Sequence, residues 1–265
     1  MGFFERFNPD RPGPGVEKDA QPKPVFFVFL SVYTRKFYKL LQLNLIHFVF
    51  NLPAIILAFI ISENIFHTIS PKNEFPIFAW MSMACFLVAV NIISVGPFQS
   101  GFSYILRNFS REEHAFVWSD YIKIAKKNLK QSLLMCLINI LIFCVLSSSI
   151  TWYISSDQKS VFLTIAVGLQ ALLLLIFYMM QLYTYQLLVT FDLKLRHIYK
   201  NALLFSLARF FPNLLILLLC FAFIVIIMFN IIIALILLPT FAFSVVGLIT
   251  NFYANRVIKK YMLKD

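Results

Sequence analysis

The chain has 265 residues, of which 60% are hydrophobic and only 13% are charged, and 31 of them are phenylalanine. A soluble domain of this size would have too few polar side chains to cover its surface, so the composition indicates an integral membrane protein. The formal net charge of +11 does not call for nucleic acid as a partner, because basic residues gather in the cytoplasmic loops of membrane proteins and near anionic headgroups.

The N-terminal segment differs from the rest of the chain. Residues 8–24 are rich in proline, glycine and charge, and such a segment cannot bury enough apolar surface to fold alone. We therefore expect residues 1–24 to be a disordered cytoplasmic tether. No apolar core with a small-residue cleavage site follows the start, so we expect no cleaved signal peptide. Residues 25–265 are expected to form a single polytopic domain, which begins with an amphipathic interfacial helix over residues 25–41.

Six apolar stretches follow, and most reach the roughly 20 residues that a helix needs to cross a hydrocarbon core. They cover residues 40–61, 75–106, 133–154, 161–191, 214–229 and 231–253. The predicted fold class is therefore all-α integral membrane, with six transmembrane helices. Only Asn230 and Pro239 interrupt the last two stretches, so the sequence leaves the position of their turn open.

The distribution of lysine and arginine along the chain predicts the orientation of the protein in the membrane. All 23 of them except Lys72 and Lys159 lie before the first span, in the loops 107–132 and 192–213, or after the last span. Because loops rich in lysine and arginine stay in the cytoplasm, we expect both termini and both loops to be cytoplasmic. The first expected partner is the lipid bilayer.

The loop 107–132 carries a predicted amphipathic helix. Ser110 and Glu113 have the spacing of a capping box, which predicts a helix start just after the second span. Apolar residues then recur at helical spacing, with lysines mostly on the other faces: Trp118, Ile122, Ala125 and Leu129. This helix either rests on the membrane or contacts a cytoplasmic partner. The candidate partner-contact surface consists of Trp118, Tyr121, Ile122 and Lys126.

A second candidate site lies inside the first span. Asn44, His47 and Asn51 share one helical face at spacings of three and four residues. This polar intramembrane face either lines a cavity or forms hydrogen bonds across a helix interface. No Asp, Glu, Lys or Arg occupies the middle of a predicted span, which argues against a proton- or ion-coupled pump.

The second span contains a candidate helix kink. Proline removes a backbone hydrogen bond and glycine permits close approach, so a kink or an unwound turn is expected there. The residues concerned are Gly96, Pro97 and Gly101. The sequence shows no catalytic Ser, His and Asp arrangement, no phosphate-binding glycine-rich loop and no metal-ligand spacing. We therefore expect a protein that is not an enzyme and has no cofactor, metal site or disulfide.

A set of motifs in this order resembles the YesL family of bacterial membrane proteins. They are Phe7-Asn8, Pro12-Gly13-Pro14-Gly15-Val16, the segment Arg35 to Leu40, Gly96-Pro97, Arg111, Trp118-Ser119-Asp120-Tyr121 and Lys127-Asn128. The resemblance covers essentially the whole chain. It implies a multi-pass protein of the bacterial plasma membrane whose gene often sits beside those of carbohydrate ABC importers.

Two functions remain open at this point. The first is a non-enzymatic accessory, assembly or regulatory partner of a carbohydrate ABC importer, in contact with its permease and ATPase subunits. The second is a transporter or permease for a small solute, with a path near the polar intramembrane face and the Gly96-Pro97 pair. A homo-oligomer is compatible with both functions. An ABC permease itself is disfavoured, because the loops lack the Glu-Ala-Ala and following Gly pattern that docks an ATPase.

Overall fold

The computed structural model of the protein describes residues 24–69, 72, 77–156 and 160–262. The tether expected over residues 1–24 lies outside this part, apart from Pro24. All regular elements of the described residues are helices, and there is no strand among them, which confirms the all-α class. In chain order they are α1 (Val25–Arg35), α2 (Phe37–Ile69), α3 (Ile77–Ala89), α4 (Gly96–Ser110), α5 (Val117–Lys127), α6 (Leu129–Ser155), α7 (Val161–Thr190), α8 (Leu195–Ala208), α9 (Phe210–Met228), α10 (Ile231–Leu237), the π-helix η2 (Leu238–Ala242) and α11 (Phe243–Met262).

Five helical segments of the described chain are long and apolar enough to cross a membrane: α2, α6, α7, α9 and the run from α10 to α11. Large apolar side chains on these helices are exposed, including Leu137, Leu141, Ile226 and Leu235. Exposed apolar surface of this extent indicates contact with lipid. The protein is therefore a multi-pass helical membrane protein.

The second predicted span is not one helix. α3 ends at Ala89 and α4 begins at Gly96, and between them Asn91 has φ 62°, in the left-handed region that ends a helix. Pro97 lies in the first turn of α4, where its missing N–H leaves no carbonyl without a donor. The prediction of a continuous span over residues 75–106 is therefore wrong, and the helix over 25–41 likewise divides at Lys36.

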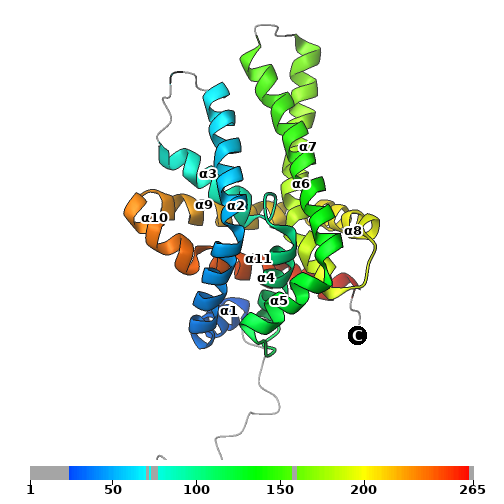
Figure 1. The fold of residues 1–265 in the computed structure, drawn as a ribbon. Helices are drawn as coiled ribbons and strands as arrows, with labels where there is room; N and C mark the ends of the chain where they lie inside the picture. The colour runs from blue at the N-terminus through cyan, green and yellow to red at the C-terminus, as the bar shows by residue number, and fades with distance from the viewer. Residues whose placement is uncertain (1–23, 70–71, 73–76, 157–159, 263–265) are drawn as a thin grey trace, which may run out of the picture.

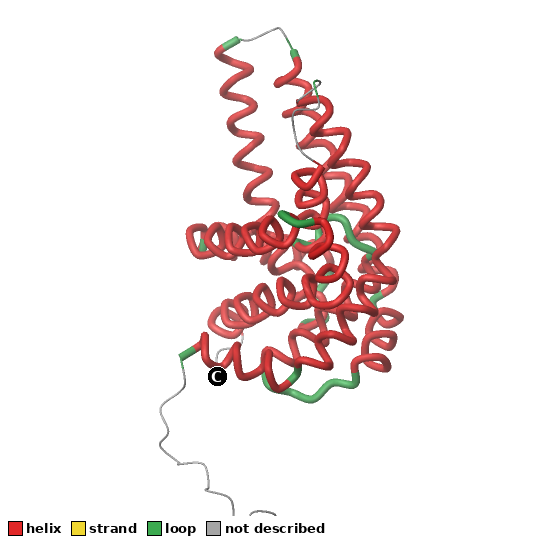
Figure 2. Tube along the Cα trace, turned by 90° about the vertical axis from the view of Figure 1, so that its left-hand side faces the viewer, coloured by secondary structure: helices red, strands yellow, loops and turns green. Residues whose placement is uncertain are grey.

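The candidate spans do not share one direction. Figure 1 shows α2, α6 and α7 as upright helices, whereas α9 and α10 run across them. Figure 2 shows the same division, with long helices rising above a layer of crosswise ones. No single membrane normal therefore runs along all five segments. α1, α5 and the end of α11 lie in the lower part of the view, away from the upper ends of α6 and α7 (Figure 1).

α4 is the central helix of the fold. It packs against α2, α5, α6, α7 and α11, and most of its residues are buried, including polar ones such as Gln99 and Arg107. It is less hydrophobic than α2, α6 and α7 around it, as suits a helix that faces protein instead of lipid. The polar residues that α4 and its neighbours bury form the contacts described next.

Candidate functional site

Asn44 joins α2 to the irregular turn before α11. Its Nδ2 donates to the carbonyl oxygen of Leu238 over 2.8 Å, and its Oδ1 accepts from the N–H of Ser244 over 2.7 Å. Leu238 is the first residue of the π-helix η2, which also contains Pro239. A π-turn with a proline leaves backbone groups without their regular partners. The Asn44 amide supplies partners for one carbonyl and one N–H at this turn.

Asn51 joins the same helix to the interruption between α3 and α4. Its Oδ1 accepts from the N–H of Val95 over 2.9 Å, and its Nδ2 donates to the carbonyl oxygen of His47 over 3.0 Å. The His47 ring stacks on Phe102 of α4, with 3.8 Å between ring centroids. All three residues of the polar intramembrane face are buried. These contacts fit the helix-interface alternative, in which the face holds neighbouring segments together.

Side chains of α4, α6 and α7 contact the segment that interrupts the helix between α3 and α4. Gln99 Nε2 donates to Asn91 Oδ1, and the Cys136 thiol of α6 donates to the carbonyl oxygen of Ser94 over 2.8 Å. The Ser94 hydroxyl also lies 3.5 Å from the Tyr185 hydroxyl of α7. Residues 90–95 therefore have a defined conformation set by α2, α4, α6 and α7.

The three candidate kink residues follow this unwound segment. Gly96 and Pro97 form the first turn of α4, and Gly101 lies inside the regular helix. The unwound segment 90–95 is therefore N-terminal to all three. Both glycines allow close helix contact. A Cβ on Gly96 would lie 2.0 Å from the carbonyl oxygen of Ser132 in α6, and a Cβ on Gly101 would lie 2.5 Å from that of Tyr121 in α5.

The capping box predicted at Ser110 and Glu113 is wrong, because this segment ends a helix. The N–H of Glu113 donates to the carbonyl oxygen of Asn108 over 2.8 Å, and that of Glu112 donates to Phe109 over 3.1 Å. Glu112 has φ 61°, as the Schellman motif at a helix C-terminus requires. The next helix, α5, starts at Val117, and Asp120 caps it by accepting from the N–H of Phe116 over 2.9 Å.

The predicted partner-contact surface is only partly exposed. Trp118 and Lys126 are exposed, and Ile122 is half-buried. Tyr121 is fully buried, because it belongs to the face of α5 that packs against the rest of the protein, together with Val117 and Ala125. Its ring stacks near Phe50 and Phe98, at centroid distances of 6.1 and 6.3 Å. Including Tyr121 in a partner surface was therefore wrong, whereas its neighbours remain candidates.

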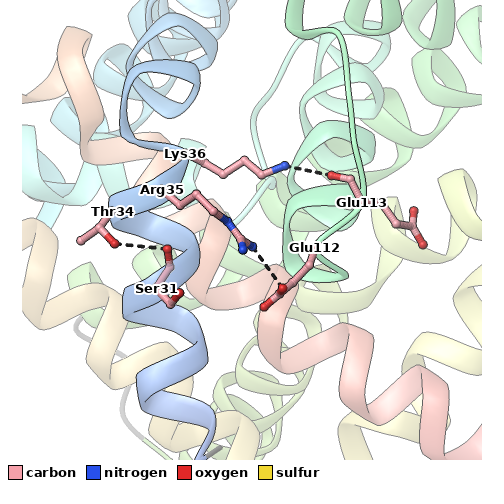
Figure 3. Close-up of polar contacts among 6 residues, drawn as sticks. All are labelled: Ser31, Thr34, Arg35, Lys36, Glu112 and Glu113. Atoms are coloured by element: carbon pink, nitrogen blue, oxygen red, sulfur yellow. Dashed lines mark hydrogen bonds and ion pairs between the residues drawn. The ribbon is translucent and has the colours of Figure 1, made fainter. Parts of the chain in front are cut away.

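The turn between α1 and α2 is tied to the loop that follows α4 (Figure 3). Arg35 Nη2 lies 3.1 Å from Glu112 Oε2, and Lys36 Nζ donates to the carbonyl oxygen of Glu113 over 3.0 Å. The Lys36 ammonium also lies 4.7 Å from the centre of the Phe109 ring. Burial, with the neighbouring Lys39 and Arg35, lowers the pKa of Lys36. These contacts fix the orientation of the loop that leads into α5.

We expect the two basic residues of this turn to contribute unequally to stability. Both members of the Arg35–Glu112 pair are about half exposed, so Arg35→Ala should lower the free energy of unfolding by less than about 1 kcal/mol. Lys36→Ala should cost about 1–3 kcal/mol, because it removes the donor to Glu113 and the contact with Phe109. Denaturant titration of the purified protein in detergent measures both values. A larger loss for Arg35→Ala than for Lys36→Ala would contradict this interpretation of the turn.

Comparison with known proteins agrees with a multi-pass membrane protein. Residues 40–150 match the model of a family described as "Protein of unknown function, DUF624". That family consists of membrane proteins and includes YesL, so the match supports the resemblance at the level of the family. The matched segment runs from α2 into α6 and contains the polar intramembrane face, the interruption before α4 and α5. No curated protein and no solved structure matches the chain.

Proposed function

We propose that the protein is a non-enzymatic accessory partner of a carbohydrate ABC importer in the bacterial plasma membrane, and that it docks through α5. The observation that carries the proposal is a pair of exposed aromatic side chains, Phe116 and Trp118, at the start of this helix. Exposed lysines follow on the same helix: Lys123, Lys126 and Lys127. Aromatic side chains are enriched in protein interfaces, where a few such anchors supply most of the affinity, and charged groups at the rim steer association.

The packing of α5 against the rest of the protein supports docking. Its buried face packs on α4, where Gly101 lets the two backbones approach closely, and the loop before it is fixed by Lys36. A partner that binds this face therefore meets a preformed surface and loses little entropy in ordering it. A groove of about 380 Å³ adjoins the aromatic pair and is lined by residues from α2, from the loop before α5 and from the start of α5: Lys39, Gln42, His114, Ala115, Phe116, Val117, Trp118 and Ser119.

The identity of the partner rests on the resemblance to the YesL family, whose genes often sit beside carbohydrate importers. The proposed side of the membrane rests on the charge distribution. Lys39, Arg111 and the lysines of α5 belong to the basic segments predicted to be cytoplasmic, where an importer's ATPase lies. The proposed contact is therefore with the cytoplasmic parts of a permease or with its ATPase.

Site-specific photocrosslinking in native membranes tests the docking surface. A photoreactive amino acid at Trp118 should crosslink to a permease or ATPase subunit, identified by mass spectrometry. The same group at Trp152 is the control, because Trp152 is 58% exposed, close to the 56% of Trp118, but lies in the last turn of α6. Crosslinks to lipid alone from position 118, or the same proteins from both positions, would contradict docking through α5.

A transporter is the second candidate, and the interruption between α3 and α4 is the observation that favours it. Discontinuous helices often form substrate sites in transporters. Against this function, the polar side chains near the interruption already bind protein groups, namely Val95, Ser94 and Asn91. Uptake of labelled sugars by vesicles that contain only this protein tests the candidate. Accumulation above that of empty vesicles would support a transporter and count against a purely accessory role.

A further inference from the structure

We propose that Arg107 and Arg111 hold a phosphate group at the junction of α4, α7 and α11, beside the buried amides of Gln186 and Asn251. This site differs from the docking surface on α5. In the sequence, both arginines belong to the basic loop 107–132, and Arg111 is also one of the residues shared with the YesL family. The three helices pack against one another in every pair, so the junction is enclosed by elements far apart in sequence.

Arg107 lies in the last turn of α4 and Arg111 is its C-cap residue, and the two side chains reach different neighbours. Arg107 Nη1 donates to the carbonyl oxygen of Val189 in α7 over 2.5 Å. Arg111 Nε donates to Asn255 Oδ1 in α11 over 2.9 Å. Each guanidinium thus points into the junction from α4.

The positive charge at the junction has no ion pair among the described residues, and Glu113, in the loop after α4, acts on Arg107 only from beyond 4 Å. Within the part of the chain that the structure describes, neither guanidinium lies within 4 Å of an acidic side chain, and Arg107 is buried. A buried cation without a counterion is costly. The C-terminal ends of α4 and α7 offset part of this charge, because helix carbonyls carry partial negative charge there.

Unpartnered polar atoms give a second, independent indication of a ligand. Gln186 and Asn251 are only 3% and 5% exposed, yet both polar atoms of Gln186 and the Oδ1 of Asn251 have no hydrogen-bond partner. Arg111 Nη2 and Thr190 Oγ1 lack partners as well. Gln186 and Thr190 flank Val189 on α7, and Asn251 lies one turn before Asn255 on α11. The unpartnered atoms therefore lie within about one turn of the groups that the two arginines bind.

The donors and acceptors at the junction define the ligand. Guanidinium, amide and hydroxyl groups donate to oxygens, and guanidinium groups match the geometry of phosphate oxygens. The oxygens of Gln186 and Asn251 accept, so the ligand also needs at least one hydroxyl donor. A protonated inorganic phosphate and the headgroup of a phospholipid with free hydroxyls, such as phosphatidylglycerol, share this chemistry.

The test compares thermal unfolding midpoints of the purified full-length protein. Inorganic phosphate is titrated against chloride at constant ionic strength in detergent. In parallel, the protein is placed in phosphatidylcholine vesicles with and without phosphatidylglycerol. A saturable rise of the midpoint with phosphate identifies a free phosphate as the ligand, and a rise with phosphatidylglycerol alone identifies a lipid headgroup. No rise in either arm would overturn the proposal.

Two variants assign the effect to the junction. Arg111→Gln should weaken the response about tenfold or more, because it removes a charged donor to phosphate. Arg196→Gln is the matched control, since Arg196 is an exposed arginine on α8. Gln186→Leu should leave the ligand-free midpoint unchanged or higher, because it removes an unpartnered buried amide, while it reduces the response. An unchanged response in both Arg111→Gln and Gln186→Leu would place the ligand elsewhere and overturn the proposal.

Discussion

Gly96→Ala should destabilise the protein strongly, by about 3 kcal/mol or more. The new Cβ would lie 2.0 Å from the carbonyl oxygen of Ser132 and 2.6 Å from its carbon. Both are backbone atoms, so no side-chain rotation relieves the overlap and α4 must move away from α6. That movement would also strain the hydrogen bond from Cys136 to Ser94. The measurement is the unfolding free energy in detergent, together with the fraction of monodisperse protein on gel filtration.

Gly168→Ala is the matched control for this variant. Gly168 lies inside α7, and a Cβ there would meet nothing within 4 Å. Alanine has a higher helix propensity than glycine by about 1 kcal/mol, so this change should leave stability equal or higher. Equal stability of Gly96→Ala and Gly168→Ala would show that α4 and α6 are not in close backbone contact at Gly96.

Asn44→Leu should lower the free energy of unfolding by about 2–5 kcal/mol. The leucine has the same branching and the same number of heavy atoms, but it removes the side-chain partners of the Leu238 carbonyl and the Ser244 N–H. Each unsatisfied buried group costs about 1–3 kcal/mol, and the Leu238 carbonyl lies beside the proline of η2, where the helix is already irregular. Hydrogen exchange should also show faster exchange at Ser244 in the variant than in the wild type.

Asn64→Leu is the control, because Asn64 lies on the same helix but is exposed and donates only to the carbonyl of Ile60. This change should alter the free energy of unfolding by less than about 0.5 kcal/mol. Similar effects of the two substitutions would mean that Asn44 does not bind the turn before α11.

The long apolar helices were predictable from the sequence. The stretches 133–154 and 161–191 correspond to α6 (Leu129–Ser155) and α7 (Val161–Thr190). They could be predicted because a helix in lipid needs a long run of uncharged residues, and such runs are uncommon elsewhere. The interruption before α4 was not located correctly. Residues 90–95 are mostly apolar, so the apolar composition continues across the break, and the residues that indicated an irregularity, Gly96, Pro97 and Gly101, all follow it.

The sequence predicted which residues form the candidate sites better than it predicted what those residues contact. Spacing placed Asn44, His47 and Asn51 on one face, but Leu238 and Ser244 are about 200 residues away in sequence and no local pattern connects them. Tyr121 was misplaced because aromatic residues occur on both buried and exposed faces of a helix near a membrane. The Ser110 to Glu113 segment was misinterpreted because the same residue types occur where a helix starts and where one ends in a Schellman motif.

Purification of the tagged protein from its native membrane in a gentle detergent, followed by gel filtration and mass spectrometry, tests the proposed function most directly. We expect stoichiometric recovery of the permeases or ATPase of a carbohydrate importer, and loss of those subunits when Phe116 and Trp118 are both changed to alanine. Recovery of the protein alone, as a monomer or a homo-oligomer, under conditions that preserve a known importer complex would contradict it.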